Sequence, residues 1–173
     1  MDNYLDLIEP YFGKIVIWKG EEEYRSTLAA IPRDLVLLTA ANLCYSEIGN
    51  GGILQLFLNS TGTVVPEGIE GFRALGMPQT AEFVEQAANL LGTPYPRDRA
   101  QRQDALLRAT KTTPEDFARL LEQHKHPFIA HLKAAEPLDL EGISERMYAM
   151  CEMENGGFET EADRFAKRIQ AAQ

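Results

Sequence analysis

The chain has 173 residues and a formal net charge of −9, with 45% hydrophobic and 25% charged residues. This length suits one domain that buries roughly two-thirds of the surface its unfolded form exposes, and the composition is globular rather than disordered. The negative charge argues against nucleic acid or an anionic membrane as the main partner, because both would repel it, whereas a basic protein surface would attract it.

The N-terminus and the cysteines predict a cytoplasmic protein without a membrane span. The first residues, MDNYLDLIEPYF, are acidic and lack the basic region and cleavage site of a signal peptide. No apolar run approaches the roughly 20 residues that a membrane span needs. Cys44 and Cys151 both lie among apolar neighbours and form no disulfide framework, so we expect two buried thiols.

The first part of the chain predicts two short helices. Apolar residues at helical spacing indicate a helix over residues 4–12. The β-branched run from Ile15 to Trp18 has no second strand-like run nearby, so we expect an extended or buried segment. Glu21 to Glu23 open the next helix, since carboxylates favour the positive end of the helix dipole, and Pro32 ends it.

The centre of the fold is predicted at Leu35 to Asn59. From Leu35 to Ile48, apolar residues cover every side, which is typical of a helix buried all round. Gly49-Asn50-Gly51-Gly52 then stops the helix, because glycine and asparagine tolerate a left-handed backbone. A second apolar run, Ile53 to Leu58, follows at once. We therefore expect two core helices that meet at a tight glycine corner.

After this corner we expect a loop from Gly62 to Gly68 and a short helix from Ile69 to Leu75, closed by Gly76. Another helix begins at Pro78, and its predicted buried stripe is Phe83, Ala87, Leu90 and Leu91.

The remaining part of the chain predicts more helices. Thr113 to Asp116 is a good helix start, and Pro127 and Pro137 bracket one more helical piece. Two helices follow, with Glu152 to Phe158 between them echoing Glu47 to Ile53. Their predicted core faces are Ile143, Met147, Met150 and Cys151 in the first, and Phe158, Ala162, Phe165 and Ile169 in the second.

Charge is unevenly distributed along the chain. From Glu136 to Asp163, nine acidic residues stand against one basic residue, Arg146, a net charge of −8. From Arg97 to Lys111, five basic residues outnumber two aspartates, a net charge of +3. The chain therefore has an acidic end and a basic middle, and the basic middle could bind another acidic surface, including that of a sister subunit.

No pattern in the sequence predicts an enzyme, a metal site or a cofactor. His124, His126 and His131 lack the i, i+4 spacing or the cysteine partners of a zinc site. Gly49-Asn50-Gly51-Gly52 has no following Lys or Ser/Thr, as a phosphate-binding P-loop would. Carboxylates are plentiful, but no pattern marks one as buried with a raised pKa, which acid–base catalysis needs.

Polar residues around the glycine corner carry a family resemblance. Asn50-Gly51-Gly52 is preceded by Glu47 and followed by Gln55 and Asn59, and Phe72-Arg73-Ala74-Leu75-Gly76 comes later. This pattern resembles the signature of a bacterial DNA-mimic-protein domain family, although Ile53 stands where that family usually has Phe. The resemblance spans Leu35 to Leu91, and we expect its motif residues to be structural: Glu47, Asn50, Gly51, Gly52, Gln55 and Asn59.

The resemblance implies an all-α homodimer whose acidic surface imitates DNA phosphates and keeps a DNA-binding protein, such as a helix-turn-helix regulator, from DNA. We expect one all-helical domain over residues 1–173. On a helix, Glu141, Glu145 and Glu152 lie within about 40° of one another, at axial spacings of roughly 6 and 10 Å. Two and three phosphate steps of about 3.4 Å come close to these values. The candidate partner-binding residues are Asp139, Glu141, Glu145, Glu152, Glu154, Glu159, Glu161 and Asp163.

Two alternatives stay open. Acidic residues at helix starts and basic residues at helix ends are favoured by the helix dipole alone, so the acidic end could be an ordinary solvated face. The chain would then be a general protein–protein adaptor on the same fold. The other alternative is an enzyme whose pocket lies beside the Asn-Gly-Gly corner and uses Glu47 or Asn50.

Overall fold

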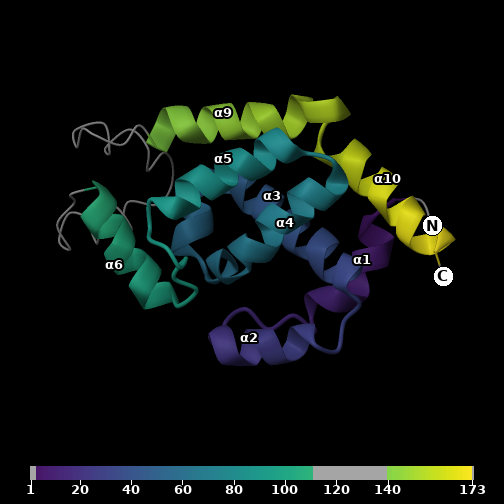
Figure 1. The fold of residues 1–173 in the computed structure, drawn as a ribbon, viewed down its shortest axis with the longest axis horizontal. Helices are drawn as coiled ribbons and strands as arrows, with labels where there is room; N and C mark the ends of the chain where they lie inside the picture. Colours follow the sequence, from purple (N-terminus) through teal and green to yellow (C-terminus); the bar gives the residue numbers. More distant parts are fainter. Residues whose placement is uncertain (1–2, 111–139, 173) are drawn as a thin grey trace.

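Helix α3 (Arg33–Leu58) passes through the centre of the fold, and the other helices pack around it (Figure 1). The computed structural model describes the backbone of residues 3–110 and 140–172 and the side chains of residues 3–109 and 146–172. Every regular element within these ranges is a helix, which confirms the all-α prediction. None of the helices described is both long and apolar enough to cross a membrane.

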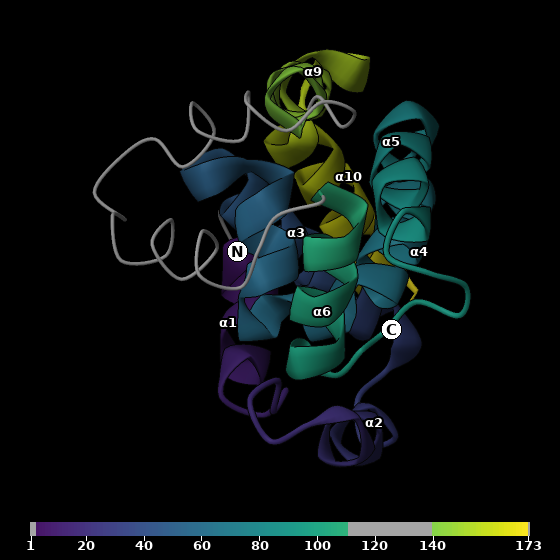
Figure 2. The same ribbon diagram turned by 90° about the vertical axis from the view of Figure 1, so that its left-hand side faces the viewer.

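The first two helices are those that the sequence predicts. Helix α1 spans Leu5–Phe12 and α2 spans Glu21–Leu28. Ile15, between them, is buried without forming a strand. Helix α2 buries only Tyr24 among its own residues and lies at the edge of the molecule opposite α9 (Figures 1 and 2).

The glycine corner lies within α3. Gly51 has an extended φ of −161°, and Gly52 has φ 74° and ψ −175°, so the helix is broken at this point into two helical parts. The residues from Leu35 to Asn42 are all buried, which confirms burial on every side for the first half of the predicted stretch. In its second half Leu43 and Tyr45 are only partly buried and Ser46 is exposed. The prediction of two core helices meeting at glycines is confirmed.

The predicted loop from Gly62 to Gly68 is wrong. A 3-10 turn, η1 (Ser60–Val64), leads directly into α4 (Val65–Leu75), which contains Gly68. A Cβ atom on Gly68 would lie 2.4 Å from Cys44 Sγ, and one on Gly71 would lie 2.3 Å from the Leu37 carbonyl oxygen. These glycines let α4 approach α3 closely, and this packing role is why they stand inside a helix.

Helix α5 (Pro78–Asn89) begins at the predicted proline, and the predicted buried stripe is confirmed only in part, since Ala87 and Leu91 are buried. Leu90 is 45% exposed and Phe83 is only partly buried. The side facing the core consists of Thr80, Ala81, Val84, Ala87 and Ala88. Small residues let α5 lie close to its neighbours, so the largest apolar side chains do not mark the inner face. Helix α6 (Arg99–Thr110) follows and packs against α3 (Figure 2).

The last part of the described chain consists of α9 (Leu140–Met153), a 3-10 turn, η2 (Glu154–Gly156), and α10 (Phe158–Ala171). Met147 and Cys151 are fully buried, and Met150 is half-buried. In α10 the whole predicted face is buried, namely Phe158, Ala162, Phe165 and Ile169. The helices predicted after Thr113 and between Pro127 and Pro137, the side chain of Ile143, and the three histidines lie outside the described residues.

Candidate partner-binding surface

The motif residues at the glycine corner are joined by hydrogen bonds. The Glu47 carboxylate accepts hydrogen bonds from Gln55 Nε2 at 2.8 Å, Asn59 Nδ2 at 3.0 Å and Thr61 Oγ1 at 2.7 Å. Glu47 lies before the break in α3 and its donors lie after it, so these bonds connect the two parts of the helix. Asn50, in contrast, is exposed. Sequence reasoning missed Thr61, which contributes to this cluster from η1.

The basic stretch binds the carboxyl end of α3. Arg102 is completely buried, and it donates to the Phe57 oxygen at 3.0 Å, the Asn59 oxygen at 2.7 Å and the Arg97 oxygen. Arg99 Nε donates to the Leu58 oxygen at 2.8 Å. The last carbonyls of a helix have no partner within the helix and carry its negative dipole end, so guanidinium groups stabilise them.

A second contact fixes α2 and α4 to the same stretch. Arg97 forms two hydrogen bonds with the buried Glu67 carboxylate, at 2.7 and 2.8 Å, and Tyr24 Oη donates to that carboxylate at 2.9 Å. Arg97 and Arg102 therefore have partners inside their own chain. The idea that the basic stretch as a whole faces a sister subunit is wrong for these two residues, and Lys111 lies outside the described residues.

Two of the candidate acidic residues are buried and bind internal groups. Glu154 is 8% exposed and accepts hydrogen bonds from Gln79 N at 2.8 Å, Thr80 N at 2.8 Å and Thr80 Oγ1 at 2.7 Å. It thus satisfies free N–H groups at the start of α5. Glu161 is 6% exposed and forms a salt bridge with Arg164. Neither carboxylate is available to a partner, which corrects the expectation that both belong to the binding surface.

Three other candidates surround a group of aromatic rings where α9 meets α10. Exposed Glu152 accepts a hydrogen bond from Tyr45 Oη at 2.7 Å, and half-exposed Asp163 accepts one from Tyr4 N at 2.7 Å. Glu159 is exposed on the first turn of α10. We call Glu152, Glu159 and Asp163 the acidic edge.

The three carboxylates of the acidic edge lie close enough to two tyrosines, Tyr4 and Tyr45, to affect their pKa values. Burial, together with the nearby negative charges of Glu159 and Asp163, raises the pKa of Tyr4 to about 12. Burial also raises the pKa of Tyr45, and the negative charges of Glu152 and Glu159 contribute to this rise. The two tyrosines both contact the Phe158 ring, with centroids 5.8 Å apart for Tyr4 and 4.3 Å for Tyr45. Glu159 therefore influences both tyrosines, and the three charges lie over one packed aromatic group.

The remaining candidates can be placed only in part. Glu141 and Glu145 belong to α9, but their side chains lie outside the described residues, as does Asp139. The backbone of α9 is helical from Leu140 through Met153, so Glu141, Glu145 and Glu152 share one uninterrupted helix.

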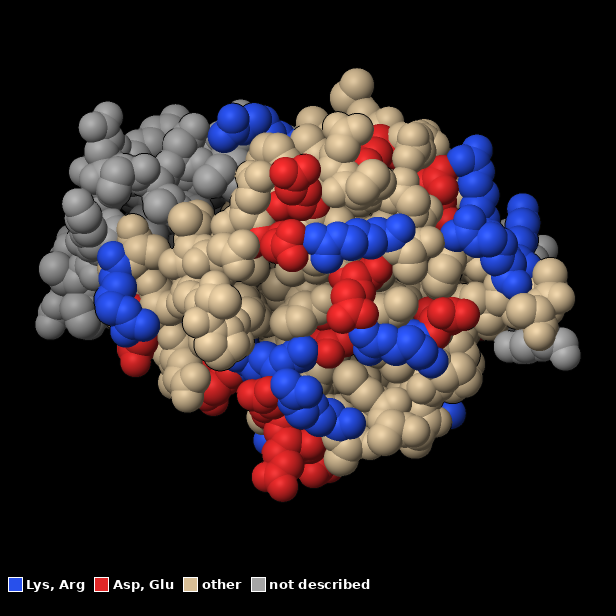
Figure 3. All heavy atoms as spheres, in the orientation of Figure 1, with Lys and Arg blue, Asp and Glu red and all other residues tan. Residues whose placement is uncertain are grey.

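The surface as a whole is not uniformly acidic. On the face seen in Figure 1, Lys and Arg side chains alternate with Asp and Glu side chains (Figure 3). Helices α2 to α5 carry several salt bridges, including Arg73–Glu85 at 2.6 Å and Arg33–Glu70. Such exposed pairs are typical of a solvated surface. Charge resembling a row of phosphates is therefore not a property of every face.

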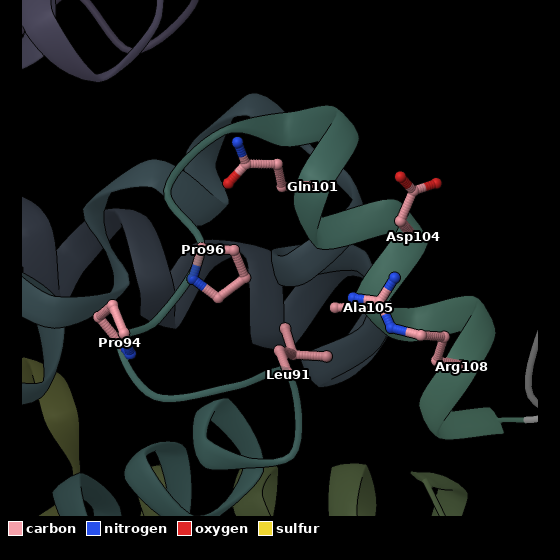
Figure 4. Close-up of a pocket in the computed structure, with 7 residues that line it drawn as sticks. All are labelled: Leu91, Pro94, Pro96, Gln101, Asp104, Ala105 and Arg108. Carbon is pink, nitrogen blue, oxygen red and sulfur yellow. The ribbon is translucent and has the colours of Figure 1, made fainter.

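A shallow hollow of about 230 Å³ lies between α6 and the segment from Leu91 to Pro96 (Figure 4). Its polar side chains are Gln101, Asp104 and Arg108. It does not adjoin the Asn-Gly-Gly corner, where the enzyme alternative placed its pocket. Among the described residues, no group of three or more His, Cys, Asp or Glu side chains could hold a metal ion.

The part of the chain that the structure describes forms an all-α protein. A family model described as DMP19-like protein matches residues 29–168, so the chain belongs to the DMP19-like family, the DNA-mimic family that the corner motif resembles. No curated protein and no solved structure matches the chain.

Proposed function

We propose that this protein is an acidic DNA mimic that binds the DNA-contacting surface of a helix-turn-helix regulator and blocks its access to DNA. The observation that carries the proposal is the family match over residues 29–168. The acidic edge supports it, because no salt bridge within the described residues engages Glu152, Glu159 or Asp163. Their charge remains for the Lys and Arg side chains that a DNA-binding protein presents to phosphates.

The geometry of the acidic edge suits such a partner. Tyr45 Oη and Tyr4 N hold two of its carboxylates in place, which lowers the entropy lost when a partner binds. Glu159 and Asp163 stand one helical turn apart, roughly 6 Å along the axis. This spacing is close to two phosphate steps of about 3.4 Å. With Glu141 and Glu145, these residues form the surface that we propose.

We further propose that the protein is a cytoplasmic homodimer. Many helix-turn-helix regulators bind two half-sites as symmetric dimers, so a two-fold symmetric mimic would present its acidic edge twice. Sedimentation of the purified chain tests this part alone. A monomer at every concentration would remove the dimer from the proposal and leave the competition with DNA in place.

A competition experiment tests the function. The immobilised protein captures DNA-binding proteins from the source cell, and a captured regulator is then placed on its own operator DNA in a gel shift. We expect the parent to displace the DNA, less effectively at higher salt. Glu152→Gln/Glu159→Gln should compete more weakly and with a shallower salt dependence, since Gln preserves helix propensity but removes charge.

The matched control is Glu22→Gln/Glu23→Gln, which removes the same charge from exposed positions on α2. It should compete as the parent does. A parent that displaces DNA from none of the captured proteins refutes the proposal. The adaptor alternative, which the mixed charges of Figure 3 favour, predicts a bound protein whose affinity depends only weakly on salt.

A further inference from the structure

The outward face of α9 combines apolar and acidic side chains over its last two turns. Met153 is 78% exposed and Tyr148 is 47% exposed, and Ala149 and Glu152 are exposed as well. Residues four apart are neighbours on a helix surface, so Tyr148 and Glu152 form one row and Ala149 and Met153 form the next. We call these four residues the α9 strip. Tyr148 and Met153 stand five residues apart, about 140° around the helix, so they lie on either side of Glu152 and not in one continuous apolar patch.

The side of α9 opposite the strip packs against the core of the protein. Met147 and Cys151, on the opposite side of the helix, are completely buried. Tyr148 lies close to α3, since a Cβ atom on Gly49 would be 3.6 Å from its Cε2. Glu152 is held by Tyr45. A half-exposed aromatic ring and a fixed carboxylate on one rigid helix are the kind of anchors that protein interfaces use.

We propose that the α9 strip docks an arginine-bearing amphipathic helix, the chemistry of a DNA-recognition helix with apolar neighbours. This inference rests on the proposed function, and it adds aromatic and apolar contacts to the attraction between charges. Glu152 accepts hydrogen bonds from a guanidinium group whose plane stacks on the Tyr148 ring. Met153, a flexible apolar side chain, packs against the apolar residues of the partner. The neighbouring Glu159 and the net charge of −9 favour a basic partner.

In this arrangement charged contacts and apolar contacts each contribute to binding, and their salt dependence distinguishes them. Contacts with charge weaken as salt rises, whereas apolar contacts do not. A pure phosphate imitation would bind every basic surface of equal charge. The α9 strip instead lets the protein discriminate between basic surfaces with and without apolar residues.

Two labelled synthetic peptides test the inference on the full chain. One contains only arginines, and the other is an amphipathic helix with the same number of arginines and a leucine face. We expect the parent to bind the amphipathic peptide more tightly at every salt concentration. Tyr148→Leu, which removes the aromatic face, and Met153→Gln should each weaken the amphipathic peptide by about three- to tenfold and barely affect the all-arginine peptide.

Two further variants complete the design. Glu152→Gln should weaken both peptides and make their salt dependence shallower. Trp18→Ala is the control, because Trp18 is 61% exposed. It belongs to the segment between α1 and α2, and this segment lies away from α9 (Figure 1). It should bind as the parent does, and melting curves exclude unfolding as the cause of any loss.

The outcomes distinguish the inference from the proposed function. If Tyr148→Leu and Met153→Gln melt normally and bind both peptides as the parent does, the α9 strip takes no part in docking and the inference is wrong. A parent that binds neither peptide overturns it as well. A parent that binds the amphipathic peptide through the strip but never displaces DNA from a regulator overturns the proposed function alone.

Discussion

Gly52 is the residue on which the central corner depends. Its φ of 74° with ψ of −175° is a conformation that essentially only glycine adopts. Gly51 has an extended φ, so its constraint is space, because a Cβ atom there would lie 2.1 Å from Gln55 Oε1. The sequence predicts that the Asn-Gly-Gly segment turns. It does not predict which glycine takes the positive φ, since both tolerate it equally.

We predict that Gly52→Val destabilises the protein by at least about 1–3 kcal/mol, because a β-branched residue is strained at this φ. Gly51→Val should also destabilise, by displacing the Gln55 side chain that binds Glu47. Gly49→Ala should cost less, since its Cβ atom would meet only Tyr148, at 3.6 Å. Urea unfolding of the three variants measures these differences. Equal stability of Gly52→Val and the parent would contradict the backbone geometry described above.

At the scale of elements, the helices are predicted well and their contacts less well. Apolar periodicity places α9 and α10 and most of their buried faces, because both helices have one clearly apolar side. Periodicity fails where small residues make the contact, as at Gly68 and Gly71 in α4. It also fails to show that Arg102 is buried, because the carbonyls it binds include that of Phe57, 45 positions away.

We predict that replacing the buried Arg102 destabilises the protein. Arg102→Met preserves much of the side-chain length but removes the guanidinium that donates to the Phe57, Arg97 and Asn59 oxygens. The Asn59 oxygen still accepts from Gly62 N and the Arg97 oxygen from Thr63 Oγ1, so the Phe57 oxygen is the most affected of the three. A buried acceptor left unsatisfied costs about 1–3 kcal/mol, so the Phe57 oxygen alone predicts a loss of at least about 1–3 kcal/mol. Arg102→Lys should rescue this only in part, since a compact ammonium cannot reproduce the planar fork of a guanidinium.

Arg108→Met is the matched control for this prediction. Arg108 is exposed on the same helix, so its replacement should change stability by no more than about 0.5 kcal/mol. Urea unfolding compares all three variants with the parent. If Arg102→Met and Arg108→Met cost the same, the buried guanidinium does not hold the end of α3.

For the whole molecule, composition and pattern predict the all-α class but only part of the candidate surface. Burial of an acidic residue depends on what the rest of the chain places beside it. All four of these residues are glutamates in the same acidic part of the sequence: Glu152, Glu154, Glu159 and Glu161. Yet Glu154 and Glu161 are buried and bind groups of their own chain. Residues distant in sequence, such as Thr80 and Tyr45, decide which carboxylates bind inside the protein and which remain at its surface.

Several ionisable groups of the core link stability to alkaline pH. Burial raises the pKa of Tyr4 and of Cys151 to about 12, and it also raises the pKa of Tyr24 and of Cys44. In the unfolded chain, thiols titrate near about pH 8.5 and tyrosines near about pH 10. The folded protein therefore keeps protons that the unfolded chain releases, so unfolding is favoured as pH rises.

We predict that these groups contribute their full stabilisation below about pH 8.5. Their contribution to the free energy of unfolding then falls as the pH rises toward 12. Each group contributes a slope of up to about 1.4 kcal/mol per pH unit between its unfolded and folded pKa. Urea unfolding at a series of alkaline pH values measures this slope. In Cys151→Ala the decline should be shallower just above about pH 8.5, because one thiol no longer titrates. A parent whose stability stays constant up to about pH 11 would show that these groups are accessible to solvent.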